Sequence, residues 1–516
     1  MSAIITDQIR ILNAKNFVAG VSSSANSYYS FIGLPNPTDY QSDWEKNPPA
    51  PKDSFDDENK YWDDMIALKK ISAADARQVI PKRMWTSGTV YDMYRADYTR
   101  TNTAKVSGAT NLYNASYYVI NADYRVYECL QNGTAPETPN GKSSLDEPTF
   151  VDLEPRAAGT SGDGYIWKYL YTIKPSDIVK FDSTNFIPVP QDWATSSDNA
   201  PVRNNAVNGS VKIVTIKNRG VGIGTANRTY TRVPIRGNGT GGECTVVINN
   251  DQTVDSVTVS SQGSGYTYAN VDLAAGGVPS GTTAPDFDVV ISPEGGHGAD
   301  IYRELGAYNV LLYSRIENDT ENPDFVTGNE FARIGVVENP KATDSSLLVA
   351  DKASALDALK ITGVGYSSAV FTIDGEFTQT VAAGSTAVGR VVSYDQTTGV
   401  LKYWQDRSLA GFNTVGTAQT DPKYGYELIQ FSSTPVSPGS LDISHASVSN
   451  LSIDSSFSGI STVINNKTYY LGQSFTNGIG SPEVEKYTGN IIYVDNRPSI
   501  TRSSNQKEDI KVILQF

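Results

Sequence analysis

The stretch GDGYIWKYLYTIKPSD, from Gly162 to Asp177, decides how this chain is expected to fold. Aromatic residues stand at every second position from Tyr165 to Tyr171, and a period of two predicts a half-buried β-strand. Pro175 ends the pairing, because proline has no N–H to donate to a neighbouring strand. We therefore expect a glycine loop, then an aromatic strand, and then a proline that ends the strand.

A second informative stretch, GNIIYVDNRPSITRSSNQKEDIKVILQF, runs from Gly489 to Phe516. Asp495 and Asn496 predict a turn, since Asp and Asn favour turn conformations. The closing residues alternate apolar and polar positions up to Phe516, which is typical of a strand. The sequence thus predicts strand, turn and strand, with the chain ending inside a sheet.

Length and composition favour a β-rich protein with large contact surfaces. The chain has 516 residues, and single domains usually run to about 100–200 residues, so we expect two to four structural units. Only 19% of the residues are charged, and 30 tyrosines outnumber 16 phenylalanines. Such amphipathic aromatic residues suit contact surfaces. The formal net charge of −14, without a basic run, argues against a nucleic-acid partner.

Cysteine usage and hydropathy bear on the compartment. Cys129 and Cys244 are the only cysteines, too few for a disulfide framework, which favours synthesis and assembly in a reducing cytoplasm. The first 20 residues show no signal-peptide pattern, and no window approaches the roughly 18 apolar residues of a membrane span. We therefore expect a soluble protein that does not cross a membrane.

Helix is predicted only near the N-terminus. Ile5, Ile9 and Leu12 share one helical face, and a second helix is expected from about Asp56 to Lys70, with acidic residues first and lysines last. Beyond them strands dominate, with one strand pair expected around residues 121–123 and a hairpin around residues 249–252. Two Gly/Thr/Val-rich stretches, at about 205–295 and 346–475, have the texture of separate small β-units, and neither shows a regular repeat.

Candidate chemistry is sparse, and we predict no catalytic, cofactor or metal site. Glycines follow a strand at Gly220, but no helix follows to hold a phosphate. His297 and His445 lie in different predicted units, and each is interpreted as a polar loop residue. The acidic run before Tyr61 lacks the spacing of a calcium loop and predicts a solvated helix N-terminus.

Large aromatic side chains are the candidate contact residues. Aromatics in desolvated pockets carry much of the energy of a typical interface, whereas core packing is the alternative for each of them. The candidate interface aromatics are Trp44, Trp62, Tyr403 and Trp404.

The stretches at 162–177 and 489–516 resemble the gene-eight family of baseplate wedge proteins from T-even-type contractile-tailed phages. That family carries a Gly-Asp-Gly-Tyr-x-Trp strand and an Asn-Arg-Pro turn before its final strand. Weaker similarity runs through VIPKRMW and YRVYECL, and about half of the chain is covered. The matching residues are Gly162, Asp163, Gly164, Tyr165, Trp167, Asn496, Arg497 and Pro498.

The resemblance implies a mainly β fold: a β-sandwich scaffold with a few N-terminal helices, interrupted by two inserted small β-domains that have no counterpart in the T-even version. The first part of the wedge scaffold is expected at 1–204 and its continuation at 296–345, with C-terminal scaffold strands at 476–516. The inserted β-domains are expected at 205–295 and 346–475.

The function implied by the resemblance is that of a structural subunit rather than an enzyme. It would form a homodimer in the virion's tail baseplate, join other wedge proteins, and take part in the rearrangement that triggers sheath contraction. The alternative is a tail fibre or tailspike-type protein that binds host-surface polysaccharide. That alternative predicts trimers and a regular repeat through residues 205–475, which the sequence does not show.

Overall fold

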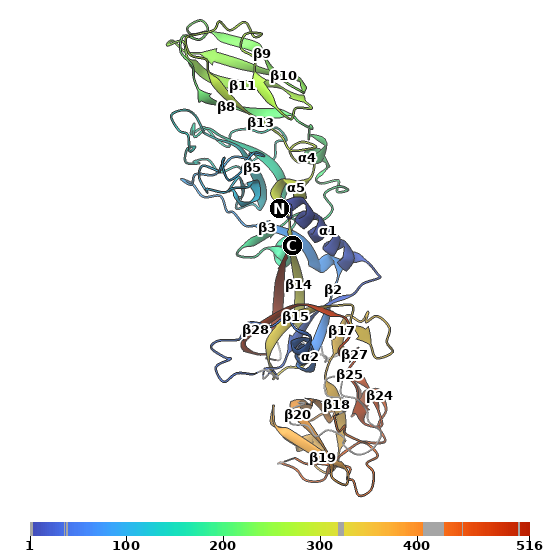
Figure 1. The fold of residues 1–516 in the computed structure, drawn as a ribbon. Helices are drawn as coiled ribbons and strands as arrows, with labels where there is room; N and C mark the ends of the chain where they lie inside the picture. The colour runs from blue at the N-terminus through green and yellow to red at the C-terminus, as the bar shows by residue number, and fades with distance from the viewer. Residues whose placement is uncertain are drawn as a thin grey trace. The chain divides into compact units, whose positions relative to one another are not determined.

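The computed structural model describes residues 4–35, 37, 40–317, 325–405, 428–445, 447–503 and 506–516 (Figure 1). Within these ranges the chain is mainly β, with several antiparallel sheets and few helices, which confirms the predicted fold class. The chain divides into two compact units, and the predicted five-segment division stays a prediction. Unit 1 comprises Met1–Val18, Arg77–Leu311 and Ile513–Phe516, and unit 2 comprises Ala19–Ala76 and Leu312–Val512.

The aromatic strand lies in unit 1, in an antiparallel sheet of order β4-β5-β6. Tyr165 and Trp167 are buried as predicted, but Lys168 and Leu170 on the other side are buried too, so both faces of the strand are covered. The strict alternation fails for this reason and because the pairing with β5 shifts register twice. The three strands are β4 (Tyr118–Ile120), β5 (Arg125–Asn132) and β6 (Tyr165–Thr172).

Pro175 begins a helix instead of only ending a strand. It occupies the first turn of α3, where its missing N–H is no loss. The remaining short elements around this core are α3 (Pro175–Phe181), α4 (Ala200–Asn204), α5 (Ile301–Leu305), η2 (Leu112–Asn114), β3 (Ala76–Pro81) and β7 (Phe186–Pro188). The chain ends inside a sheet, as predicted, in the order β29-β14-β3-β7, with β14 (Asn309–Glu317) and β29 (Lys507–Gln515).

The Gly/Thr/Val-rich stretch before residue 292 forms strands with an apolar core of their own (Figure 1). The predicted hairpin is confirmed, since β10 and β11 pair antiparallel around residues 249–253. A four-stranded sheet has the order β11-β10-β9-β12, and β8 pairs with β13. The strands are β8 (Val211–Asn218), β9 (Thr229–Gly237), β10 (Thr240–Ile248), β11 (Val254–Ser264), β12 (Ala269–Val271) and β13 (Asp286–Ile291).

Unit 2 is built on an antiparallel sheet of order β17-β2-β1-β15-β28. All six residues of the central strand β1 are buried. The strands are β1 (Tyr28–Gly33), β2 (Met65–Ile71), β15 (Glu330–Glu338), β17 (Lys352–Ser354) and β28 (Asn490–Thr501).

A second sheet of unit 2 has the order β19-β20-β21-β18-β26-β25-β24, joined at β18 by β23 and β22. Its strands are β18 (Asp357–Thr362), β19 (Glu376–Ala382), β20 (Ser385–Asp395), β21 (Val400–Trp404), β22 (Asp442–Ile443), β23 (Leu451–Ile453), β24 (Gly459–Ile464), β25 (Lys467–Thr476) and β26 (Ile479–Gly480). The smaller elements are β16 (Lys341–Ala342), which pairs with β27 (Val484–Glu485), η1 (Ala73–Asp75) and η3 (Tyr366–Ser368).

Both N-terminal helices exist, but each differs from its prediction. In α1 (Asp7–Ser22) Ile9 and Leu12 are 47% and 52% exposed. The helical face singled out from the sequence is therefore not the buried one. The buried face holds Ile11, Ala14, Val18 and Val21. The second helix, α2 (Phe55–Asp63), ends seven residues before Lys70, because the apolar run from Met65 pairs with β1 as strand β2. Pairing in the sheet overrides the local helical pattern there.

The predicted turn at Asp495 and Asn496 is also wrong. These residues lie inside β28, which continues from Asn490 to Thr501 and pairs with β15.

No helix among the described residues is long and apolar enough to cross a membrane.

Candidate functional site

The glycine loop before β6 is closed by its own aspartate. Asp163 accepts hydrogen bonds from the backbone N–H of Leu145 at 2.9 Å and of Tyr165 at 3.0 Å. Gly164 has φ +83°, and a Cβ there would lie 2.8 Å from the Cα of Gly133. Glycine is required at this position because the backbone is left-handed and another strand end approaches it closely.

Tyr165 and Trp167 then fasten the long loop that precedes β6. The Tyr165 hydroxyl accepts from the N–H of Tyr91 at 2.9 Å and donates to the carbonyl of Lys142 at 2.7 Å. Trp167 exchanges two backbone hydrogen bonds of 3.0 Å with Arg156. The predicted signature residues of this motif therefore hold a scaffold loop in place.

The second motif is built around a buried cation in unit 2. Arg333 on β15 donates to Oδ2 of Asp64 at 2.5 Å and to Oδ1 of Asn496 at 2.8 Å. Both ion-pair partners have fully buried side chains. Asn496 in turn donates to the carbonyl of Pro49 at 2.9 Å. A predicted turn residue thus serves as a buried hydrogen-bond bridge, which explains why it stays in the strand.

The rest of this motif completes the same cluster. The carbonyl of Arg497 accepts from Trp44 Nε1 at 2.8 Å, and the Arg333 guanidinium lies 4.6 Å from the ring centroid of Tyr61. Pro498 lies on β28, at the edge of its sheet, where a residue without an N–H is tolerated. The motif joins strand β28 to the segment before α2.

The four candidate interface aromatics are all buried within the chain. This is the position that core packing predicts, so their burial gives the interface role no support, and that role stays a prediction. The exposed fractions are 0% for Trp44, 1% for Trp62, 2% for Tyr403 and 3% for Trp404.

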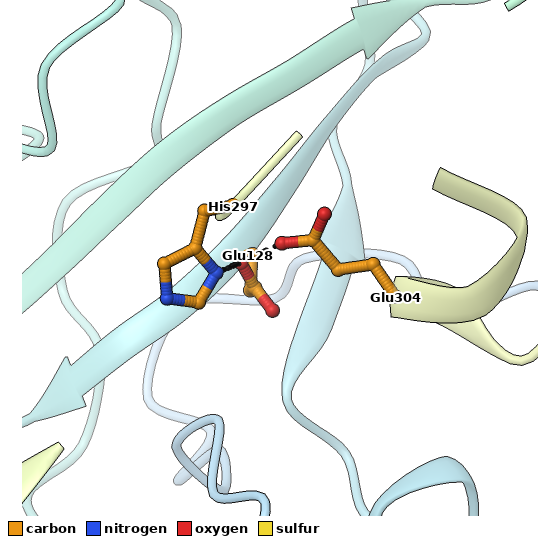
Figure 2. A group of neighbouring side chains, drawn as sticks. All are labelled: Glu128, His297 and Glu304. Carbon is orange, nitrogen blue, oxygen red and sulfur yellow. Dashed lines mark hydrogen bonds and ion pairs between the residues drawn. The ribbon is translucent and has the colours of Figure 1, made fainter. Parts of the chain in front are cut away.

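A buried histidine lies between two carboxylates in unit 1 (Figure 2). His297 Nδ1 is 2.8 Å from Oε2 of Glu128 and 2.8 Å from Oε1 of Glu304. Glu128 comes from the middle of β5, Glu304 from α5, and His297 from the glycine turn before that helix. We refer to these three residues as the Glu128 cluster.

Burial and close contact set the protonation of the cluster. Burial, together with the neighbouring Glu304 carboxylate, raises the pKa of Glu128 to about 8. Burial alone lowers the pKa of His297, but the Glu128 and Glu304 carboxylates outweigh it and raise that pKa to about 9. Hydrogen bonds from His297 and Glu128 outweigh burial and hold the pKa of Glu304 below its usual value. The arrangement can hold protons or a cation.

The sequence analysis missed this cluster. Interpreting His297 as a polar residue of a flexible loop was wrong, because its side chain is 4% exposed and its ring packs edge-on against Tyr94. A charged residue inside the apolar strand YRVYECL was the available signal for Glu128, but nothing local connects Glu128 with Glu304. His445 lies in unit 2 and contacts Ser447, so the structure does not bring the two histidines together in one unit.

The acidic run before Tyr61 forms a helix N-terminus as predicted, but it is not fully solvated, because Asp57 is only 7% exposed. Ser54 caps α2 by accepting from the N–H of Asp57, and the first turn carries Asp56, Asp57 and Glu58. Carboxylates at that end interact favourably with the positive end of the helix dipole.

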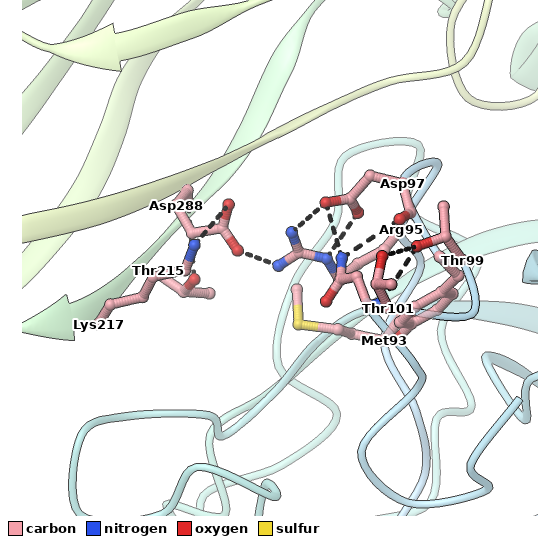
Figure 3. A network of polar contacts seen from close by, with 10 residues as sticks. Met93, Arg95, Asp97, Thr99, Thr101, Thr215, Lys217 and Asp288 are labelled. Atoms are coloured by element: carbon pink, nitrogen blue, oxygen red, sulfur yellow. Dashed lines mark hydrogen bonds and ion pairs between the residues drawn. The ribbon is translucent and has the colours of Figure 1, made fainter. Parts of the chain in front are cut away.

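A second polar network in unit 1 fastens strands β8 and β13 to an earlier loop (Figure 3). Arg95 donates to both carboxylate oxygens of Asp97, at 2.9 and 2.8 Å, and also to Asp288 on β13. Lys217 on β8 lies 3.6 Å from Asp288. Burial disfavours the charged guanidinium, but the hydrogen bonds to Asp97 and Asp288 outweigh it and raise the pKa of Arg95. The ion pairs therefore persist at neutral pH.

The family match lies in the first third of the chain. Residues 3–153 match the family Phage-Gp8, described as Bacteriophage T4, Gp8. The baseplate wedge protein gp8 of Enterobacteria phage T4 is 27% identical over 230 residues, covering 39% of this chain and 64% of that relative. The chain thus matches less than two thirds of the relative's length.

The match confirms the resemblance seen in the sequence. The matched range of the family includes Glu128 but ends before the Gly162–Trp167 motif.

Proposed function

We propose that this chain is a structural subunit of a phage tail baseplate wedge. In that role it joins neighbouring baseplate proteins and takes part in the rearrangement that triggers sheath contraction. The observation that carries the proposal is the similarity of residues 3–153 to the Phage-Gp8 family, together with the 27% identity to a baseplate wedge protein. Other wedge proteins are the proposed partners, and the proposed site of action is the tail baseplate of the virion.

The use made of the signature residues supports a role without catalysis. Asp163 binds two backbone N–H groups, and Asn496 bridges Arg333 and a backbone carbonyl. Groups committed in this way fix loops and strands and do not face a substrate. A subunit that works by geometry needs such fixed segments, so we propose that the chain is not an enzyme.

A groove in unit 2 is the surface that we assign to a neighbouring baseplate protein. It has a volume of about 670 Å³ and lies between the segment before α2 and the first half of β28. Phe55 is 89% exposed beside it, and Ile492 is 37% exposed. Because β28 is an edge strand, it can receive an extended segment of a partner by backbone pairing.

The decisive experiment is to locate the chain in intact particles. Cryo-electron microscopy or immunogold labelling is expected to place it at the baseplate, with six-fold repetition. Phe55→Ser should reduce its incorporation into particles, whereas the control Val364→Ser, at a side chain 92% exposed elsewhere in unit 2, should not. Equal incorporation of both variants would argue against the groove, and a location outside the baseplate would refute the proposed function.

Oligomeric state separates this proposal from the polysaccharide-binding alternative. We propose a homodimer with the same patch used twice across a two-fold axis, whereas a tailspike-type protein would be a trimer. Light scattering of the purified full chain is expected to give a dimer. A trimer that also binds host polysaccharide on a glycan array would favour the alternative.

A further inference from the structure

We propose that Glu128, His297 and Glu304 bind one divalent transition-metal ion of the Zn²⁺ type. One ligand atom from each residue, the two carboxylate oxygens and Nδ1, lies within 4.8 Å of the others. Zinc–nitrogen and zinc–oxygen bonds are about 2.0–2.2 Å long. Small side-chain adjustments therefore allow one ion to contact all three atoms, which already converge in Figure 2.

The carboxylate of Glu128 gives an independent reason to expect a ligand. Its side chain is fully buried, and among the described residues no donor outside the cluster reaches either of its oxygens. It points at His297, the residue with which it forms an ion pair (Figure 2). A buried carboxylate whose polar contacts are confined to one imidazole and a second carboxylate is costly, and a metal ion would offset that cost by direct coordination.

The other two ligands are already held in place by their neighbours. The N–H of Gly298 donates to Oε2 of Glu304 at 2.6 Å, which leaves Oε1 facing His297. Trp193 Nε1 donates to the carbonyl of Gly298 at 3.1 Å and thereby fixes the turn that carries His297. Outer contacts of this kind orient metal ligands in proteins.

The donor set selects the class of ion. One imidazole with two carboxylates suits zinc, manganese or ferrous iron, whereas Ca²⁺ takes six to eight oxygens. Lys168 lies opposite Glu128 on β6, but its ammonium group donates to the carbonyl of Leu153 at 2.9 Å, not to the cluster carboxylates. Protons are the competing occupants, because metal binding must displace them from the ligands.

The site would have a structural role at a defined place in unit 1. One ion would join the middle of β5 to the turn and helix that follow β13, so it would fasten the chain where it returns from strands β8 to β13. This inference does not depend on the proposed function, because it concerns only the residues of unit 1.

The test uses the purified full chain, stripped with a chelator and dialysed against Zn²⁺ or Mn²⁺. We expect one ion per chain in the natural sequence and in His445→Gln, and less than a tenth of an ion in His297→Gln. Glu128→Gln imitates the protonated carboxyl, so it should fold normally and keep its melting temperature in chelator while losing the rise produced by Zn²⁺. A metal content that is the same in His297→Gln and the natural chain would overturn the proposal.

Because the chain has 2 histidines, a second measurement decides the matter if a variant fails to fold. The ¹⁵N signals of labelled imidazoles in the natural chain are followed during Zn²⁺ addition, with His445→Gln used for assignment. We expect a change at Nδ1 of His297 that is complete at one equivalent. No change at His297, or a change confined to His445, would show that the cluster holds protons only.

Discussion

Replacing Arg333 by methionine tests whether the buried ion pair holds unit 2 together. Methionine keeps an unbranched apolar stem of similar length but removes the guanidinium that contacts Asp64, Asn496 and the Tyr61 ring. Both ion-pair side chains are fully buried, and removing one partner of a buried pair costs about 3–5 kcal/mol. The lost hydrogen bond to Asn496 is part of the same network, so its energy is not added separately.

We therefore expect Arg333→Met to lower the free energy of unfolding of unit 2 by about 4 kcal/mol, about a thousand-fold in the folded-to-unfolded ratio. Arg497→Met is the matched control, because it makes the same substitution at an exposed ion pair on β28. The side chains of that pair, Arg497 and Asp495, are 51% and 31% exposed. Pairs of that kind contribute about 0–1 kcal/mol. Arg333→Met combined with Asp64→Asn should recover about half of the loss, since the uncompensated buried charge is then gone.

The assay is urea unfolding of the full chain combined with hydrogen exchange. The two units can unfold separately, so a single transition is not assumed. Exchange at the amides of β1 and β15 reports on unit 2 alone. The reasoning is refuted if Arg333→Met costs no more than Arg497→Met, or if the double variant is less stable than Arg333→Met.

Two further predictions address the glycine loop and the cap of α2. Gly164→Ala should destabilise unit 1 by at least about 2 kcal/mol, because it adds a Cβ 2.8 Å from Gly133 at φ +83°. Gly162→Ala is the control, since the backbone there has φ +73° but nothing lies within 4 Å of the new Cβ. It should cost about half as much in the same urea experiment. Asp57 has its pKa lowered from 3.8, chiefly by the hydrogen bond from Ser54 and with Lys60 contributing. Its stabilising effect is complete above that value and is lost as the pH falls through the lower folded pKa. Asp57→Asn should therefore be less stable than the natural chain at pH 7, and the difference should shrink below about pH 4; a difference that stays constant in acid would contradict this assignment.

Local patterns predicted the strands whose neighbours in the sheet are also close in sequence. The period of two identified β6, and the polar breaks identified the pairs β4–β5 and β10–β11, because a hairpin carries its own partner and turn. The same reasoning failed for β2. The residues after Asp63 continue a helical pattern, but burial between β1 and β17 decides their conformation.

The polar sites could not be predicted, because their members are distant in sequence. Asn496 was predicted to lie in a turn, since Asp-Asn-Arg-Pro favours turns locally, but its partner Arg333 is 163 positions away. In the Glu128 cluster, His297 lies seven positions from Glu304, whereas Glu128 is contributed by a strand far earlier in the chain. Sequence shows which residues are chemically able to pair, and only the fold shows which of them do.

The contact between Arg333 and Asn496 also explains how an irregular strand pair keeps its register. β15 and β28 shift register between Phe331 and Arg333, so the ladder alone does not fix the alignment there. A slip of one residue would turn Asn496 to the opposite face of the sheet, which would separate it from Arg333 and from the carbonyl of Pro49. A buried ion pair adds little stability compared with apolar side chains of the same volume, but it penalises every alignment that leaves its members unmatched. We infer that this cluster contributes more to the register of β28 than to the stability of unit 2, even though removing one member alone is costly.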